Sequence, residues 1–78
     1  MKKINYNGNY LYCSIAAYFT ASDLASGYSS SEDLYNDYKD DIIEESQKRG
    51  YNENEVNAIL SHYKIEWDNY NGKWGSDL

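Results

Sequence analysis

Proline is absent from the 78-residue sequence, and cysteine, histidine and basic residues are scarce. The single cysteine, Cys13, cannot form an internal disulfide, and one cysteine with one histidine is too few for a structural zinc site. No run approaches the roughly 18 apolar residues of a membrane-spanning helix. Asn5 and Asn7 interrupt the apolar segment that a secretory signal would need after Lys2 and Lys3. We therefore expect a cytoplasmic protein without membrane association.

Positive charge is the other shortage. Seven Lys and Arg residues stand against 13 Asp and Glu residues, which gives a formal net charge of −6. Nucleic acid and anionic lipid both require a basic surface, so we expect no direct binding to either. The charge favours a partner with a basic surface instead.

Aromatic residues, by contrast, are abundant, with ten Tyr, two Trp and one Phe. Disordered chains are poor in aromatics, so this composition predicts a folded protein. The length suits one domain, residues 1–78, with one modest core and little room for a deep substrate cavity. Such small domains gain stability by burying a face against another chain, so a homodimer is one assembly that we consider.

The N-terminal residues carry the signal of a β-hairpin. Asn7-Gly8 lies between two short segments, 4–6 and 10–12, in which apolar and polar residues alternate. Both central positions of a type I′ turn need positive φ, which Asn and Gly adopt most readily. We therefore predict a hairpin over residues 1–12.

Three helices are predicted after the hairpin. Helical apolar spacing and several alanines favour the first over about 14–26, although a longer second strand is the alternative for its first residues. Capping residues and terminal glycines place the second over 31–49 and the third over 53–70. The third has an apolar seam of Val56, Ile59, Leu60, Tyr63, Trp67 and Tyr70. The fold class is α+β, mostly α.

The second predicted helix contains the most informative segment of the chain. Residues 32–45 hold seven carboxylates and one lysine. At 100° per residue, five of the acids share one arc, well away from the arc of Leu34, Tyr35, Tyr38 and Ile42. We call the five the acidic face: Asp33, Asp37, Asp40, Asp41 and Glu44. They span about 16 Å, so one charge falls every ~4 Å, near the 3.4 Å phosphate spacing of a DNA strand.

A charged helix face is usually only a solvated face, but such faces mix charges of both signs. Here like charges recur at i,i+4, and each such pair costs about 0.2–0.5 kcal/mol. This repulsion without structural gain favours a binding surface. Whether Glu53, Glu55, Glu66 and Asp68 extend the face depends on packing.

Catalytic and metal sites find little support in the sequence. A calcium loop needs oxygen ligands around a turn glycine, whereas Asp37, Asp40 and Asp41 have helical spacing without one. Cys13 has apolar neighbours, which predicts a buried, inert thiol, and His62 lies off the seam, which predicts a solvent-facing side chain. A glycosidase-like carboxylate pair would need a walled cleft. We expect no enzyme activity, no metal and no cofactor.

Thirteen aromatic residues are more than a domain of this size can enclose. Tyr10 and Tyr12 are assigned to the core. Exposed Tyr and Trp side chains are favoured anchors of protein interfaces. The candidate anchors are Tyr35, Trp67, Tyr70 and Trp74. They carry the alternative function, that of a small protein–protein adaptor or homodimer module.

In size, charge and carboxylate spacing, the chain resembles the small acidic DNA-mimic proteins with which phages inhibit host proteins. No motif places it in one family of them. The resemblance implies a non-enzymatic phage-type inhibitor, acting in the bacterial cytoplasm, that binds the basic surface of a host nucleic-acid-binding protein. The expected targets are a sliding clamp, a nuclease or CRISPR effector, a restriction enzyme or RNA polymerase.

Overall fold

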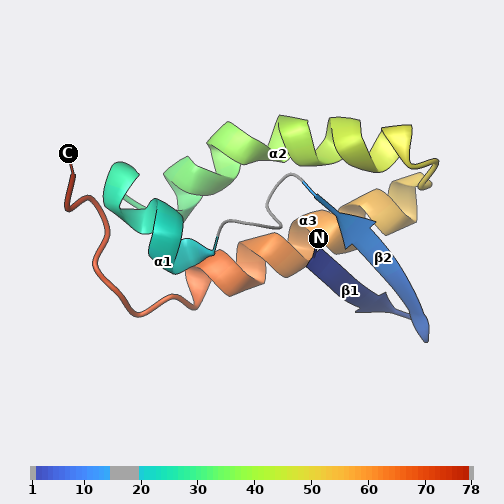
Figure 1. Cartoon of the computed structure of the whole chain (residues 1–78), viewed down its shortest axis with the longest axis horizontal. Coiled ribbons are helices and arrows are strands. Elements are labelled where there is room, and N and C mark those ends of the chain that lie inside the picture. The colour runs from blue at the N-terminus through green and yellow to red at the C-terminus, as the bar shows by residue number, and fades with distance from the viewer. Residues whose placement is uncertain (1, 15–19, 78) are drawn as a thin grey trace.

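The computed structural model describes residues 2–14 and 20–77. Its elements are strands β1 (Lys2–Tyr6) and β2 (Asn9–Cys13), the short helix α1 (Ala21–Leu24), the 3-10 turn η1 (Ala25–Gly27), and the long helices α2 (Ser31–Lys48) and α3 (Glu53–Asp68). Helices α2 and α3 run alongside each other, the hairpin packs against them, and α1 lies with the C-terminus at one end (Figure 1). The predicted α+β, mostly α class is confirmed.

The predicted hairpin is also confirmed. Strands β1 and β2 pair antiparallel, with Ile4 opposite Leu11. The turn residues Asn7 and Gly8 have φ of 51° and 83°, the positive values that a type I′ turn requires. Ile4 and Leu11 are buried and face the helices, whereas Tyr10, which precedes Leu11 on β2, is exposed. The hairpin therefore presents one apolar and one solvent face.

The first helix is shorter than predicted. Part of the predicted span, residues 15–19, lies outside the described residues. Thr20 has extended backbone angles, φ −101° and ψ 170°, and its N–H donates to Asp23 Oδ2 at 3.1 Å. This cap fixes the start of the helix at Ala21, while β2 continues to Cys13 because Leu11 and Cys13 both face the core. A helix that begins at residue 14 is wrong.

Both long helices begin at side-chain caps. In α2, Ser30 Oγ accepts from Asp33 N at 3.2 Å, and Gly50 follows the helix with φ 84°. In α3, Asn52 and Glu55 form a reciprocal capping box with both hydrogen bonds at 2.9 Å. Helix α3 ends at residue 68, slightly before the predicted position. The caps therefore set these boundaries as the sequence indicates.

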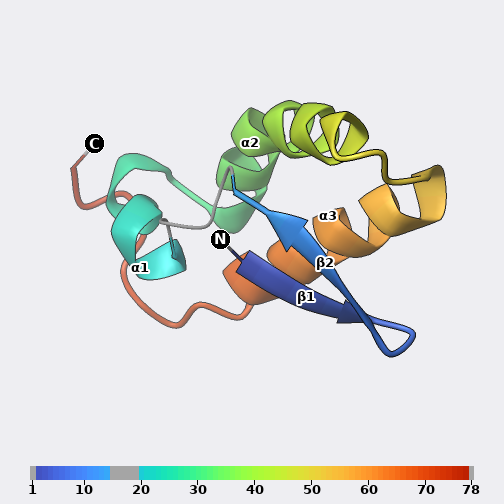
Figure 2. The same cartoon turned by 45° about the vertical axis from the view of Figure 1, so that its right-hand side comes forward.

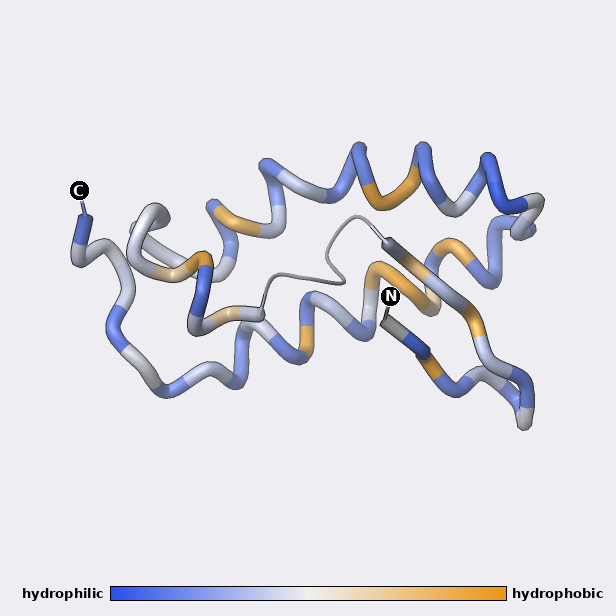
Figure 3. The backbone as a smooth tube through the Cα atoms, viewed as in Figure 1, coloured by the Kyte–Doolittle hydropathy of each residue, from blue (hydrophilic) through white to orange (hydrophobic). Residues whose placement is uncertain are grey.

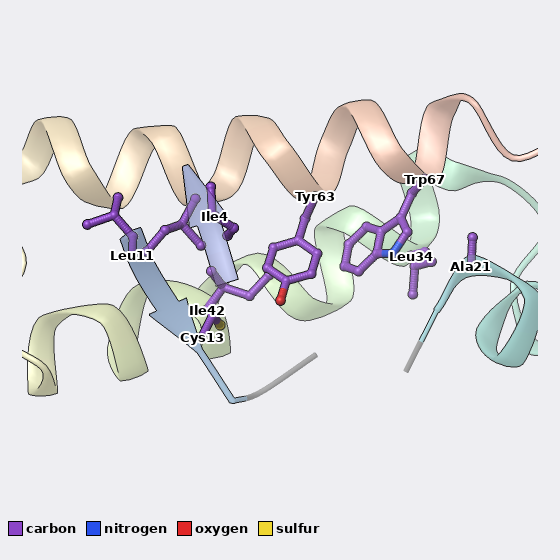
Figure 4. Packing of buried hydrophobic residues seen from close by; sticks show 9 residues of the cluster. Ile4, Leu11, Cys13, Ala21, Leu34, Ile42, Tyr63 and Trp67 are labelled. Atoms are coloured by element: carbon purple, nitrogen blue, oxygen red, sulfur yellow. The ribbon is translucent and has the colours of Figure 1, made fainter. Parts of the chain in front are cut away.

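The core joins the hairpin to all three helices (Figure 4). Its buried members are Ile4, Leu11, Cys13, Ala21, Leu34, Ile42, Ile59, Tyr63 and Trp67. Tyr63 and Trp67 are its largest side chains, and their ring centroids are 5.4 Å apart. The predicted apolar seam of α3 is thus the centre of the fold. Because α3 packs on one side of α2, the opposite side of α2 faces solvent (Figure 2).

The C-terminal tail returns to η1. Gly75 N donates to Ala25 O and Asp77 N donates to Ser26 O, both at 2.8 Å. The tail therefore closes the end of the molecule opposite the hairpin turn (Figure 1).

None of the helices in the described part of the chain is long and apolar enough to cross a membrane.

Candidate functional site

The acidic face lies on the solvent side of α2. All five of its carboxylate residues are exposed, whereas Leu34 and Ile42 on the same helix are fully buried. Hydropathy along the backbone shows the same division, with apolar residues of α2 turned toward α3 and hydrophilic residues on the outer edge (Figure 3). The predicted phasing of core and acids around the helix agrees with the structure.

Two carboxylates of the face are held by hydroxyls from the segment that precedes the helix. Tyr28 Oη donates to Asp37, and Ser29 Oγ donates to Asp33. The hydrogen bond to Asp37, followed by desolvation, raises the pKa of Tyr28 well above its ordinary value, so the phenol remains a donor. These contacts were not predicted from the sequence, although the hydroxyl-rich run 28–31 was their signal. Both bonds orient a carboxylate without neutralising it.

The remaining three acids differ in their pairing. Glu44 forms an i,i+4 ion pair with Lys48 at 3.0 Å, and both side chains are exposed, so the pair is weak. The carboxylates of Asp40 and Asp41 form no hydrogen bond or ion pair with the residues that the structure describes. The charge of the face is therefore least compensated at its centre, between Asp37 and Glu44.

Glu45 has a structural role instead. Its side chain is only 14% exposed, and its carboxylate accepts from Ser14 N at 2.8 Å and from Arg49 Nε at 3.0 Å. Desolvation acts to raise the pKa of Glu45, but the hydrogen bonds from Ser14 and the charge of Arg49 outweigh it, and the pKa is lowered. One of the seven carboxylates thus joins the end of β2 to α2.

The lowered pKa of Glu45 gives a pH-dependent contribution to stability. A depressed carboxyl pKa stabilises the fold above the unfolded-state pKa, about 4.5, and this stabilisation is lost as the pH falls through the folded pKa. We expect Glu45→Gln to lower the free energy of unfolding by about 1–3 kcal/mol at pH 7. The deficit should shrink below pH 4.5, as urea unfolding at several pH values can measure. A deficit that is constant from pH 3 to pH 7 would contradict this role.

The other acids do not enlarge the face. Glu53, Glu55 and Glu66 belong to α3, which covers the buried side of α2 (Figure 2). Glu55 caps its own helix, and Glu66 lies 3.5 Å from His62. The Asp68 carboxylate accepts from Ser31 Oγ at 2.6 Å and pairs with Lys64 at 3.3 Å. The hydrogen bond from Ser31 and the charge of Lys64 lower the pKa of Asp68.

The four predicted aromatic anchors are buried or half-buried. Trp67 is 1% exposed, so its interpretation as a surface anchor is wrong: it continues the seam one turn after Tyr63. Tyr70 and Trp74 are half-buried and pack edge to face, with centroids 5.7 Å apart. Tyr35 is half-buried near the ammonium of Lys64.

Among the residues that the structure describes, the exposed aromatics are the tyrosines of β2. Tyr10 is 52% exposed, and Tyr12 also reaches solvent, so their assignment to the core is wrong. Strand alternation sends Leu11 and Cys13 inward and these two rings outward.

No catalytic pair forms from Cys13 and His62. Cys13 is fully buried, as predicted, whereas His62 is half-buried beside Glu66. Within residues 2–14 and 20–77, no group of three or more His, Cys, Asp or Glu side chains could hold a metal ion.

No family model, curated protein or solved structure matches the chain.

Proposed function

We propose that the protein is a non-enzymatic inhibitor that binds the basic surface of a DNA-binding or DNA-processing protein through the acidic face of α2, in place of DNA. The observation that carries the proposal is the exposure of all five carboxylates on one side of a single helix. Only Glu44 among them is paired with a cation of the described chain. Phage-encoded inhibitors of host proteins act in this way, and the target class is a bacterial nucleic-acid-binding protein.

The spacing of the acids supports the proposal. Five charges along about 16 Å of helix approach the linear charge density of one DNA strand. A groove lined with Lys and Arg would meet the fixed carboxylates of Asp33 and Asp37 and the uncompensated pair Asp40 and Asp41. The face therefore offers the electrostatic pattern that such a groove uses for a phosphate backbone.

The energetic cost of the face supports a binding role as well. Asp37 and Asp41 are like charges at i,i+4, as are Asp40 and Glu44, and each pair destabilises the helix by about 0.2–0.5 kcal/mol. This repulsion does not benefit the fold, so a binding function would account for these residues.

Binding through this face should depend strongly on salt. Charges are screened beyond about 8 Å at physiological ionic strength, so charge-driven association weakens as salt increases. We expect the immobilised protein to capture a nucleic-acid-binding protein from bacterial lysate at low salt and to release it at about 0.5 M salt. Mass spectrometry identifies the captured protein. Salt-resistant capture of a protein that does not bind nucleic acid would contradict the proposal.

A further inference from the structure

Strand β1 has an open edge. In a hairpin closed by a two-residue turn, the residues that flank the turn form a hydrogen-bonded pair, and such pairs alternate along the ladder. Ile4 is therefore bonded to Leu11, and the backbone N–H and C=O groups of Lys3 and Asn5 point away from β2. These groups form no hydrogen bond with the residues that the structure describes. Unpaired groups of this kind are a template for another strand.

The opposite edge of the hairpin is occupied in its C-terminal part. Tyr12 N, which points away from β1, donates to Tyr51 Oη at 2.8 Å. Farther along, Ser14 N donates to the Glu45 carboxylate at 2.8 Å. Contacts from the α2–α3 region thus cover the C-terminal part of the β2 edge, whereas no such contact reaches the outward groups of Lys3 and Asn5 within the described residues.

The open edge lies beside an apolar surface. A hollow between β1 and α3 is lined by Lys3, His62, Ile65 and Glu66, and Ile65 is 61% exposed. No β2 residue lines this hollow, which places it on the free side of β1. The ammonium of Lys3 is turned back over the Tyr10 ring, 4.4 Å from its centroid, so it lies over β2 and leaves the edge clear. An added strand would cover Ile65.

The distribution of acidic residues leaves room for a second copy as the occupant. Residues 1–22 contain no carboxylate side chain, and the first acid of the chain is Asp23. The acidic face lies on the outer side of α2, and β1 packs on α3 (Figures 1 and 2). Two copies that meet through β1 therefore bring together their least acidic parts and keep their acidic faces apart.

We infer that β1 pairs antiparallel with β1 of a second copy, which makes a four-stranded sheet. The outward backbone groups of Lys3 and Asn5 must bond to the same groups across the two-fold axis. One register pairs all five strand residues: it places Lys3 opposite Asn5 of the partner subunit and Ile4 on the axis. A shift of one step toward the N-terminus would place Lys3 opposite Lys3 of the partner subunit. The lysines thus select the full-length register.

The register is tested by charge at position 5. In the dimer, Asn5→Glu places a carboxylate opposite Lys3 of the partner subunit, and the two-fold axis repeats this pair. Asn5→Lys places a second ammonium opposite that lysine instead, which gives two like-charged pairs. We expect the dimer dissociation constant to fall about 2- to 30-fold for Asn5→Glu and to rise by a similar factor for Asn5→Lys, relative to Asn5→Ala. Sedimentation equilibrium at low salt measures all three. Position 5 is exposed, so each variant should keep the fold.

Two outcomes would overturn the inference. A protein that is monomeric at every concentration up to about 1 mM has no such dimer. A dissociation constant of about 1 mM corresponds to a binding free energy of only ~4 kcal/mol. The opposite order, in which Asn5→Lys associates more tightly, would show that the hairpin contacts an acidic segment such as α2. A separate variant, Asn5→Pro, removes an outward N–H while sparing the β1–β2 ladder, and it should abolish dimerisation with the circular dichroism spectrum retained.

Discussion

Replacing Trp67 by alanine should lower the free energy of unfolding by about 3–5 kcal/mol, most of the stability of a domain of this size. Trp67 is buried and packs against Tyr63 and Tyr38, with centroid distances of 5.4 and 6.3 Å. Truncation would leave a large cavity where α2 and α3 meet. Urea unfolding followed by circular dichroism measures the loss.

Two variants serve as controls for this prediction. Trp67 Nε1 is buried without a hydrogen-bond partner among the described residues, so Trp67→Phe keeps most of the packing and should cost less than half as much. Ile65→Ala on the exposed side of the same helix should change stability by less than about 0.5 kcal/mol. A Trp67→Ala protein of unchanged stability would mean that Trp67 is a surface anchor and that this packing is wrong.

Neutralising the centre of the acidic face should abolish target binding without loss of the fold. In the triple variant Asp37→Asn, Asp40→Asn and Asp41→Asn, the net charge changes from −6 to −3. The amide of residue 37 still accepts the Tyr28 hydroxyl, so the local structure is retained. Removal of like-charge i,i+4 pairs should leave the helix about 1 kcal/mol more stable. Capture of the target at low salt measures the loss of binding.

A matched variant separates the face from overall charge. Glu32→Gln, Glu53→Gln and Asp77→Asn together give the same net charge of −3, since each also removes one carboxylate. All three residues are exposed, and none belongs to the acidic face. This control should bind the target within a few-fold of the unmodified protein. Equal loss of binding in both variants would mean that net charge matters and the arrangement on α2 does not.

The sequence predicted those parts of the fold that depend on local rules. The Asn7-Gly8 turn, the capped start of the third predicted helix and the helical phasing of α2 are all encoded within a few residues, and the structure has each of them. The first helix was predicted less well because alanines and apolar spacing favour a helix before residue 20. The extended Thr20 and its bond to Asp23 set a later start.

In the candidate site, too, the features that follow local sequence rules were predicted and those that depend on packing were not. Exposure of the acidic face followed from helical periodicity, because its arc is opposite the buried residues. The hydroxyl contact of Tyr28 with Asp37 and the role of Glu45 depend on how the chain turns before α2 and where β2 ends. Trp67 is buried, as its place in the apolar seam predicted, so only its second interpretation as an anchor is wrong, whereas Tyr10 was assigned to the core by residue type and is exposed.

The most direct test of DNA mimicry is competition on the captured target. Labelled duplex DNA is bound to the purified target at low salt, and the unmodified protein is added while fluorescence anisotropy is followed. We predict that the protein displaces the DNA completely, that the Asp37, Asp40 and Asp41 amide variant does not, and that the matched control does. A target that binds the protein and keeps its DNA, in a ternary complex, would contradict the account.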